Sequence, residues 1–198
     1  MAEEILDGTG KSFRGKVDSS NRLWVDSRSA SLQHDVSYTD ESAFQVTGVA
    51  NLASGTVVPL IITNNNQDKD VVITFVRHQV IGSSGGTAFP NASNYFAIRK
   101  GTSYSSGGSV ATIENINVGS SVVSGVSCYQ GAPTVTGTAA DIDRWYTKGD
   151  GDMNSFNKEG ALIIQPGQTI DLAYIGDQTS GIVYTRLSFI LRKVPKDL

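Results

Sequence analysis

The sequence contains few of the residues on which disulfide bonds and catalytic centres usually depend. Among 198 residues there is one cysteine, Cys128, and there are two histidines, His34 and His78. One cysteine cannot form an internal disulfide bond, and two separated histidines do not give the spacing of a structural zinc site. We therefore expect no metal ion and no cofactor. At this length the chain can bury roughly 70% of its unfolded surface, so a hydrophobic core alone can stabilise it.

An excess of charge of one sign and long apolar runs are also missing. Sixteen Lys and Arg residues are balanced by 19 Asp and Glu residues, for a net charge of −3, and no block of five like charges occurs. This balance disfavours a general binder of nucleic acid or of acidic membranes. No apolar run approaches the roughly 18 residues of a membrane span, and the start, Met-Ala-Glu-Glu, does not match a signal peptide. We expect a protein made in a cytoplasm, with no nucleic-acid or membrane partner.

The sequence is rich in β-branched and turn-forming residues. Val (19) and Ile (15) outnumber Leu (10) more than threefold, and there are 21 glycines. β-Branched side chains fit the pleated surface of a sheet, whereas Gly marks turns. This composition excludes a helical bundle and predicts an all-β fold.

The first 40 residues differ from the rest. They carry twelve charges and too few apolar residues for a core element, which is typical of an extended N-terminal arm (residues 1–40) ahead of a folded domain (residues 41–198). Two short extended segments, Arg14–Val17 and Arg22–Asp26, are expected within the arm. The polar residues between them, Asp18–Asn21, predict a turn.

From Ala43 onward, hydrophobic residues recur with a period of two, the spacing of half-buried strands. Nine such strands fit an antiparallel β-sandwich of the jelly-roll-like kind. They are expected at Ala43–Leu52, Val57–Thr63, Val71–Ile81, Tyr95–Arg99, Ala111–Val118, Val122–Val126, Ala161–Gln165, Gln168–Ile175 and Ile182–Val194.

Two of these predictions are specific. Pro166-Gly167 suits the central positions of a type II turn and predicts a hairpin between the strands on either side. In the last strand, one face is predicted to lie in the core. The other carries Tyr184, Ile190 and two arginines, and is either a half-exposed sheet face or a subunit interface. The predicted core face consists of Val183, Thr185, Leu187, Phe189 and Leu191.

Residues 127–160 show little periodicity and predict a long loop, and Gly82–Asn91 and Gly101–Ser109 are expected as Gly/Ser-rich loops. Loops longer than roughly 15 residues usually bind a ligand or a neighbour, so a local functional site is expected in residues 127–160. Trp145 and Tyr146 are candidates for stacking on a glycan, and the alternative is that Trp145 packs beneath the loop.

Other motifs in the sequence fail as catalytic or metal sites. Asp150–Asn154 begins like a calcium loop but lacks its later ligands, so Asp150 and Asp152 are expected to organise a turn. Gly82–Gly86 has the spacing of a nucleophile elbow without the helix that should follow it. Cys128 has no nearby His in the sequence and is interpreted as a buried, inert thiol. We expect no enzymatic activity.

Several short motifs together resemble the opening of a family of small virion structural proteins of tailed bacteriophages. The N-terminal ones are Asp7-Gly8-Thr9-Gly10, Lys16-Val17-Asp18, Asn21-Arg22-Leu23, Val25-Asp26-Ser27 and Glu41–Val46. A looser similarity continues through Val57–Leu60, Asn64–Asn66 and the segment from Lys158 to Gln168. The resemblance implies a β-rich virion component without defined catalytic residues.

Together, the arm and the resemblance lead to a functional hypothesis. The chain is expected to be a capsid decoration (cement) protein, located in the virion, that docks on the major capsid protein through its arm and forms a homo-oligomer, with a trimer favoured. The alternative is a glycan-binding module of a phage tail or fibre that uses Trp145 and Tyr146. The expected partner-binding residues are Arg14, Lys16, Arg22, Trp24 and Arg28.

Overall fold

The described residues form strands and loops, without a helix. The structure, a computed structural model, describes residues 16–17, 23–24 and 42–193. The chain divides into two compact units, residues 1–31 and 32–198. In the first unit, β1 (Lys16–Val17) and β2 (Leu23–Trp24) pair in the antiparallel direction, and each lies within one of the two extended segments predicted from the sequence.

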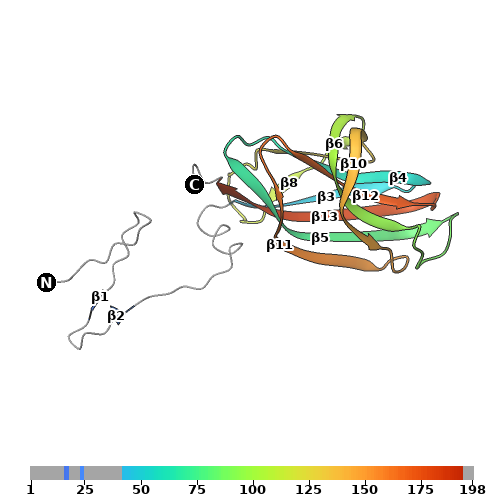
Figure 1. Cartoon of the computed structure of the whole chain (residues 1–198), viewed down its shortest axis with the longest axis horizontal. Coiled ribbons are helices and arrows are strands. Elements are labelled where there is room, and N and C mark those ends of the chain that lie inside the picture. The colour runs from blue at the N-terminus through green and yellow to red at the C-terminus, as the bar shows by residue number, and fades with distance from the viewer. Residues whose placement is uncertain (1–15, 18–22, 25–41, 194–198) are drawn as a thin grey trace. The chain divides into compact units, whose positions relative to one another are not determined.

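The second unit contains two antiparallel sheets (Figure 1). The six-stranded sheet has the order β10-β6-β12-β4-β9-β7, and the five-stranded sheet has the order β11-β5-β13-β3-β8. The six-stranded sheet consists of β4 (Gly55–Asn64), β6 (Tyr95–Ser106), β7 (Ser109–Val110), β9 (Val126–Gln130), β10 (Thr134–Tyr146) and β12 (Thr169–Gly176). The five-stranded sheet consists of β3 (Ala43–Asn51), β5 (Lys69–Ser84), β8 (Ile113–Asn115), β11 (Met153–Ile164) and β13 (Ser180–Lys193).

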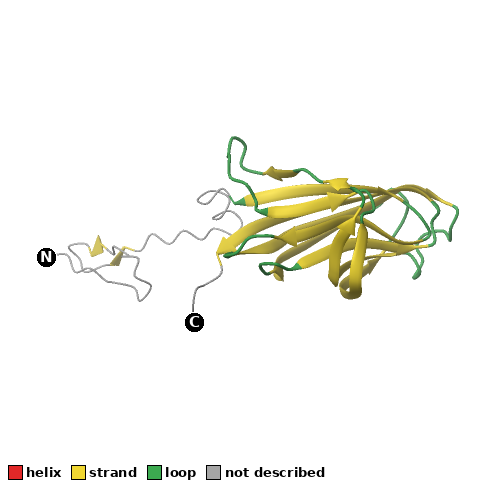
Figure 2. Ribbon diagram, turned by 90° about the horizontal axis from the view of Figure 1, so that it is seen from above, coloured by secondary structure: helices red, strands yellow, loops and turns green. Residues whose placement is uncertain are grey.

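The two sheets pack face to face around one main core, so the body is a β-sandwich (Figure 2). Leu60 and Ile62 of β4 and Leu172 of β12 contribute from one sheet, and Phe44 and Phe189, whose ring centroids lie 5.5 Å apart, contribute from the other. The all-β, antiparallel architecture predicted from composition and periodicity is confirmed.

The last strand confirms the period-two argument most clearly. All five residues of its predicted core face are buried in β13. On its opposite face, Ile182 and Arg186 are half-buried and Tyr184 is 36% exposed, whereas Ile190 packs into a small buried cluster with Ala43 and Val72. That face is therefore covered around Ile190 and open to solvent at Tyr184 and, at the other end, at Arg192, whose side chain is 42% exposed.

The prediction of a hairpin at Pro166-Gly167 is wrong, although the turn itself is present. The Gln168 amide donates to the Gln165 carbonyl at 3.0 Å, and Gly167 has φ +75°, as a type II turn requires. However, β11 pairs with β5 in one sheet and β12 pairs with β4 and β6 in the other. The turn therefore carries the chain from one sheet to the other.

The prediction of a long loop at residues 127–160 is also wrong. This segment contains most of β9, all of β10 and the first part of β11. β10 and β11 are the outermost strands of their sheets, joined by residues 147–152. In addition, β6 extends into the predicted loop Gly101–Ser109, and the predicted strand Val122–Val126 is a loop up to the start of β9.

Beyond Gly101 and Gly137, the hairpin of β6 and β10 covers part of the outer face of its own sheet. Tyr104 of β6 stacks on Tyr129 of β9, with ring centroids 3.6 Å apart, against a buried cluster on that face. Figure 1 shows the ends of β6 and β10 standing together at the top of the body. Across the described residues, no helix of the length and apolarity needed to cross a membrane is present.

Candidate functional site

Only two of the five predicted docking residues fall within the part of the chain that the structure describes. Lys16 of β1 and Trp24 of β2 are direct partners in the register of the two-stranded ribbon. Arg14, Arg22 and Arg28 lie outside the described residues. β1 and β2 pair with each other, and neither belongs to a sheet of the sandwich.

The two candidate glycan-binding residues lie on opposite faces of β10. Trp145 points between the sheets, where its ring centroid lies 4.5 Å from that of Phe156 and 5.2 Å from that of His78. Tyr146 points outward, is 52% exposed and meets Tyr95 edge-on at 6.4 Å. Adjacent residues of a strand alternate in direction, so the two rings form no common platform. The alternative interpretation, that Trp145 packs inside the protein, matches this geometry.

A groove of about 580 Å³ lies between β10 and β11, the two edge strands that residues 147–152 connect. Its size is in the range of small-ligand sites. It is lined by Arg144, Trp145, Tyr146 and Lys148 from the side of β10, and by Met153, Asn154, Ser155 and Phe156 from β11. We call it the edge groove.

Four buried polar atoms in or near the edge groove have no hydrogen-bond partner among the described residues. Trp145 Nε1 and Asn154 Nδ2 belong to residues that line the groove, whereas Thr147 Oγ1 and His78 Nε2 belong to neighbouring residues that do not. Asn154 and His78 are direct partners in the register of β11 and β5, and Thr147 follows Trp145 by two positions. Buried polar groups are nearly always hydrogen-bonded, so such a concentration at one place is unusual.

His78 is held in its neutral form. The ring is fully buried, stacks on Phe96 at 4.3 Å, and its Nδ1 is hydrogen-bonded to the Thr185 hydroxyl at 2.8 Å. Burial penalises the imidazolium and lowers the pKa of His78 to about 3. His78 therefore contributes hydrogen-bonding capacity but no charge near neutral pH.

Lys158 of β11 joins β10 next to the edge groove, although it is not one of the residues that line it. Its ammonium forms an ion pair with Asp143 and lies 5.5 Å from the ring centroid of Trp145 and 5.9 Å from that of Phe156. A cation over aromatic rings gains from their negative faces, so this position is favourable for Lys158 even beside a single carboxylate.

Asp150 lies in the turn between β10 and β11, and its carboxylate attaches this turn to β5, so the bonds of Asp150 are not the local turn bonds expected from the sequence. Its carboxylate accepts hydrogen bonds from the Ser83 amide (2.8 Å), the Ser83 hydroxyl (2.8 Å) and the Gly82 amide (3.2 Å). These bonds, those from Ser83 first, lower the pKa of Asp150. Among the described residues, no group of three or more His, Cys, Asp or Glu side chains could hold a metal ion.

Cys128 lies in the main core, as interpreted from the sequence. Burial raises the pKa of its thiol to about 12. The thiolate is the reactive form of cysteine, so Cys128 stays protonated and unreactive near neutral pH.

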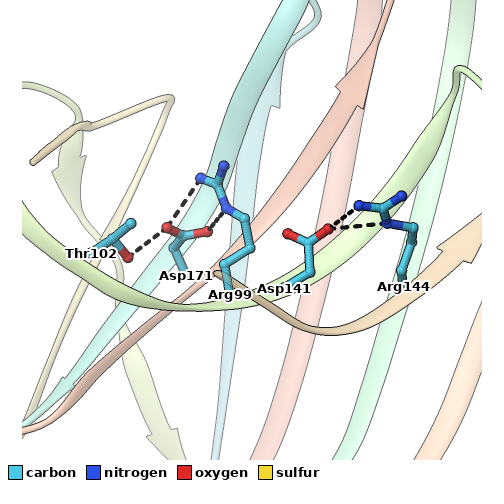
Figure 3. A network of polar contacts seen from close by, with 5 residues as sticks. All are labelled: Arg99, Thr102, Asp141, Arg144 and Asp171. Atoms are coloured by element: carbon cyan, nitrogen blue, oxygen red, sulfur yellow. Dashed lines mark hydrogen bonds and ion pairs between the residues drawn. The ribbon is translucent and has the colours of Figure 1, made fainter. Parts of the chain in front are cut away.

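The outer face of the six-stranded sheet carries two arginine–aspartate pairs (Figure 3). Arg99 and Asp171 are both buried and are joined by two hydrogen bonds of 2.7 and 3.1 Å, with Thr102 adding a third to the same carboxylate. Arg144 and Asp141, on β10, form an exposed pair at 2.5 Å. The sequence held no signal for the first pair, because 72 residues separate its members.

Asn154, which lines the edge groove, and the nearby residues Thr147 and Lys158 were not identified from the sequence. Each is an ordinary polar residue in its local context. Asn154 and Lys158 come near Trp145 only because β11 and β10 are edge strands of the two sheets that pack together. Comparison with protein-family models and with curated proteins finds no match for this chain.

Proposed function

We propose that this chain is a structural protein of a tailed-phage virion, a capsid decoration (cement) protein that docks on the major capsid shell through residues 1–40. The observation that carries the proposal is the independence of the body. Both sheets of the sandwich consist of strands from residues 43–193, and the described ribbon of β1 and β2 pairs only with itself. A docking segment must be available to a partner while the body keeps its fold.

Four of the five expected docking residues of the arm are basic and suit acidic groups on a partner protein. Arg14, Lys16, Arg22 and Arg28 can form charge-assisted hydrogen bonds to acidic groups of a capsid, and Trp24 can fill a pocket as an anchor. A short extended ribbon also offers main-chain groups for pairing with an exposed strand of the partner. The resemblance of the N-terminal motifs to phage virion proteins supports the same assignment.

A homo-oligomer, favoured as a trimer, fits this function because decoration proteins sit on symmetric shells. The part of the outer face of β13 around Tyr184 offers a surface for it. Tyr184 is exposed there and Arg186 is half-buried beside it, and Tyr and Arg are enriched at interfaces.

Imaging of virions with an antibody label against this protein tests the location. Label spread over the head shell is expected. Label confined to the tail or its fibres would overturn the capsid assignment and favour the alternative, a glycan-binding module of the tail.

A further inference from the structure

The edge groove has two features that a fully packed hydrophobic core lacks. Two of its lining residues, Trp145 and Asn154, carry buried donors without partners among the described residues, and the ion pair of Lys158 with Asp143 lies beside it. A buried donor without a partner destabilises the fold relative to a satisfied one. Sites that keep such groups usually do so for a ligand or for ordered water.

The unpartnered atoms define what a ligand must offer. The indole Nε1–H of Trp145 and the amide Nδ2 of Asn154 only donate, and both residues line the groove. Thr147 Oγ1 and His78 Nε2 can donate or accept. A ligand rich in acceptor oxygens, with some hydroxyl groups, satisfies this set. Exposed apolar surface of Tyr146 and Met153 lines the same groove and suits the C–H faces of a sugar ring.

The charges at the entrance define the second requirement. Lys148 is exposed and has no acidic partner among the described residues, whereas Lys158 is held by Asp143. A carboxylate entering the groove competes with Asp143 for the Lys158 ammonium. That ammonium lies close to the rings of Trp145 and Phe156, which both line the groove.

We infer that the edge groove binds a short saccharide that carries a carboxylate. Lys158 exchanges Asp143 for the carboxylate of the sugar, and Trp145 and Asn154 donate to its remaining oxygens. This site is independent of the docking proposal, because it lies entirely within the sandwich. A sugar is favoured over an acidic peptide because the groove is lined by two separate donors, Trp145 and Asn154, with Thr147 and His78, which can both donate and accept, close by, and such a set matches an array of hydroxyls.

Nuclear magnetic resonance of the full-length protein tests this inference. The chain has two tryptophans, so the indole N–H spectrum holds one reporter in the groove, Trp145, and one reference, Trp24; a Trp24→Phe variant assigns the two resonances. Titration with a trimer of galacturonic acid to about 10 mM should shift the Trp145 resonance in a saturable way and leave the Trp24 resonance in place. Maltotriose, which is neutral, and a tetraglutamate peptide should leave both in place.

Two variants that break the same ion pair separate binding from structure. Asp143→Asn removes the competitor for Lys158 and should tighten binding about threefold or more, whereas Lys158→Met should weaken it at least about fivefold. If the ion pair had only a structural role, both variants would change the affinity for the saccharide in the same direction. Asp70→Asn, which breaks the distant pair with Arg192, is the matched control and should leave binding unchanged.

A third variant tests whether the unpartnered donor of Asn154 lowers stability and is needed for binding. Asn154→Leu removes a buried donor at similar volume, so it should raise the melting temperature or leave it unchanged, and abolish the response of Trp145 to galacturonate. No shift at the highest galacturonate concentration would overturn the inference. An equal response to maltotriose or to tetraglutamate, or equal effects of Asp143→Asn and Lys158→Met, would do the same.

Discussion

Arg99 and Asp171, compared with Arg144 and Asp141, show how burial changes the role of an ion pair. Both pairs lie on the same side of one sheet, as Figure 3 shows, but only the first is removed from solvent. Removing a charge from water is costly, and the cost is recovered only while the partner is present. Asp171 accepts three hydrogen bonds, from Arg99 and Thr102, so each carboxylate oxygen has a donor.

Asp171→Ala is therefore expected to lower the free energy of unfolding by about 3–5 kcal/mol, because it leaves the Arg99 guanidinium buried without its counter-charge. Urea denaturation measures the change. The double variant Arg99→Met with Asp171→Leu should recover most of the loss. Asp141→Asn is the matched control and should barely change the midpoint, because Arg144 keeps its contact with water. Equal losses for Asp171→Ala and Asp141→Asn would contradict this account.

Asp177 gives a prediction on pH. Its carboxylate accepts hydrogen bonds from the hydroxyl and amide of Thr87 and from the side chain of Asn94, and these lower the pKa of Asp177 to about 2. A lowered pKa stabilises the fold above the unfolded-state value of about 4, and the contribution is lost as pH falls towards 2.

The melting temperature of the native protein should therefore exceed that of Asp177→Asn at neutral pH, and the difference should shrink between about pH 4 and pH 2. Thermal melts of both proteins across that range provide the measurement. A difference that stays constant through the range would show that the ionised form of Asp177 is not the stabilising one.

At the scale of elements, the sequence predicted strands that bury one face and missed strands that bury neither. β13 buries alternate residues from Val183 to Leu187, so its core face was identified residue by residue. Most of β10 is exposed on both faces, so hydrophobic periodicity is absent and the strand exists because it pairs with β6. Because β10 was missed, residues 127–160 were predicted to be a loop, and Trp145 and Tyr146 were predicted to act together. Adjacent residues of a strand point to opposite faces, so the two rings do not share a site surface.

The turn at Pro166-Gly167 illustrates the second limit. A turn depends on two residues and one local hydrogen bond, and the sequence contains both. Which strands pair with its flanks depends on Val71–Ile73 and on Thr63–Leu60, about 100 residues away in sequence. The edge groove has the same origin, because the residues at its two sides are aligned only when β10 and β11 end up in different sheets.

Gly48 shows how closely the two sheets approach each other. A Cβ at this position of β3 would collide with the Pro59 carbonyl oxygen of β4 and lie 2.8 Å from Leu60 Cβ. Gly48→Ala should therefore cost about 1–3 kcal/mol of stability through overpacking. Its neighbour Thr47 is exposed on the other face, so Thr47→Ala is the matched control for thermal melts. A stability unchanged by Gly48→Ala would show that the sheets can separate at this point without cost.

At the scale of the whole molecule, the described sandwich is a rigid, well-packed body, and the proposed function assigns docking to a segment outside it. Main-chain pairing by the arm and one aromatic anchor can provide most of the affinity, because a few buried residues dominate the binding energy of typical interfaces. Trp24→Ala alone should weaken docking by about 2 kcal/mol, roughly thirtyfold in affinity.

The most direct test of the central claim compares the full-length protein with a chain lacking residues 1–40, using binding to capsids that lack this protein together with thermal melts of both forms. The account predicts that the truncated chain melts within a few degrees of the full-length protein, because both sheets begin at Ala43 or later, and that it no longer binds capsids. Undiminished binding together with a much lower melting temperature would show that the arm belongs to the fold, and would contradict the account.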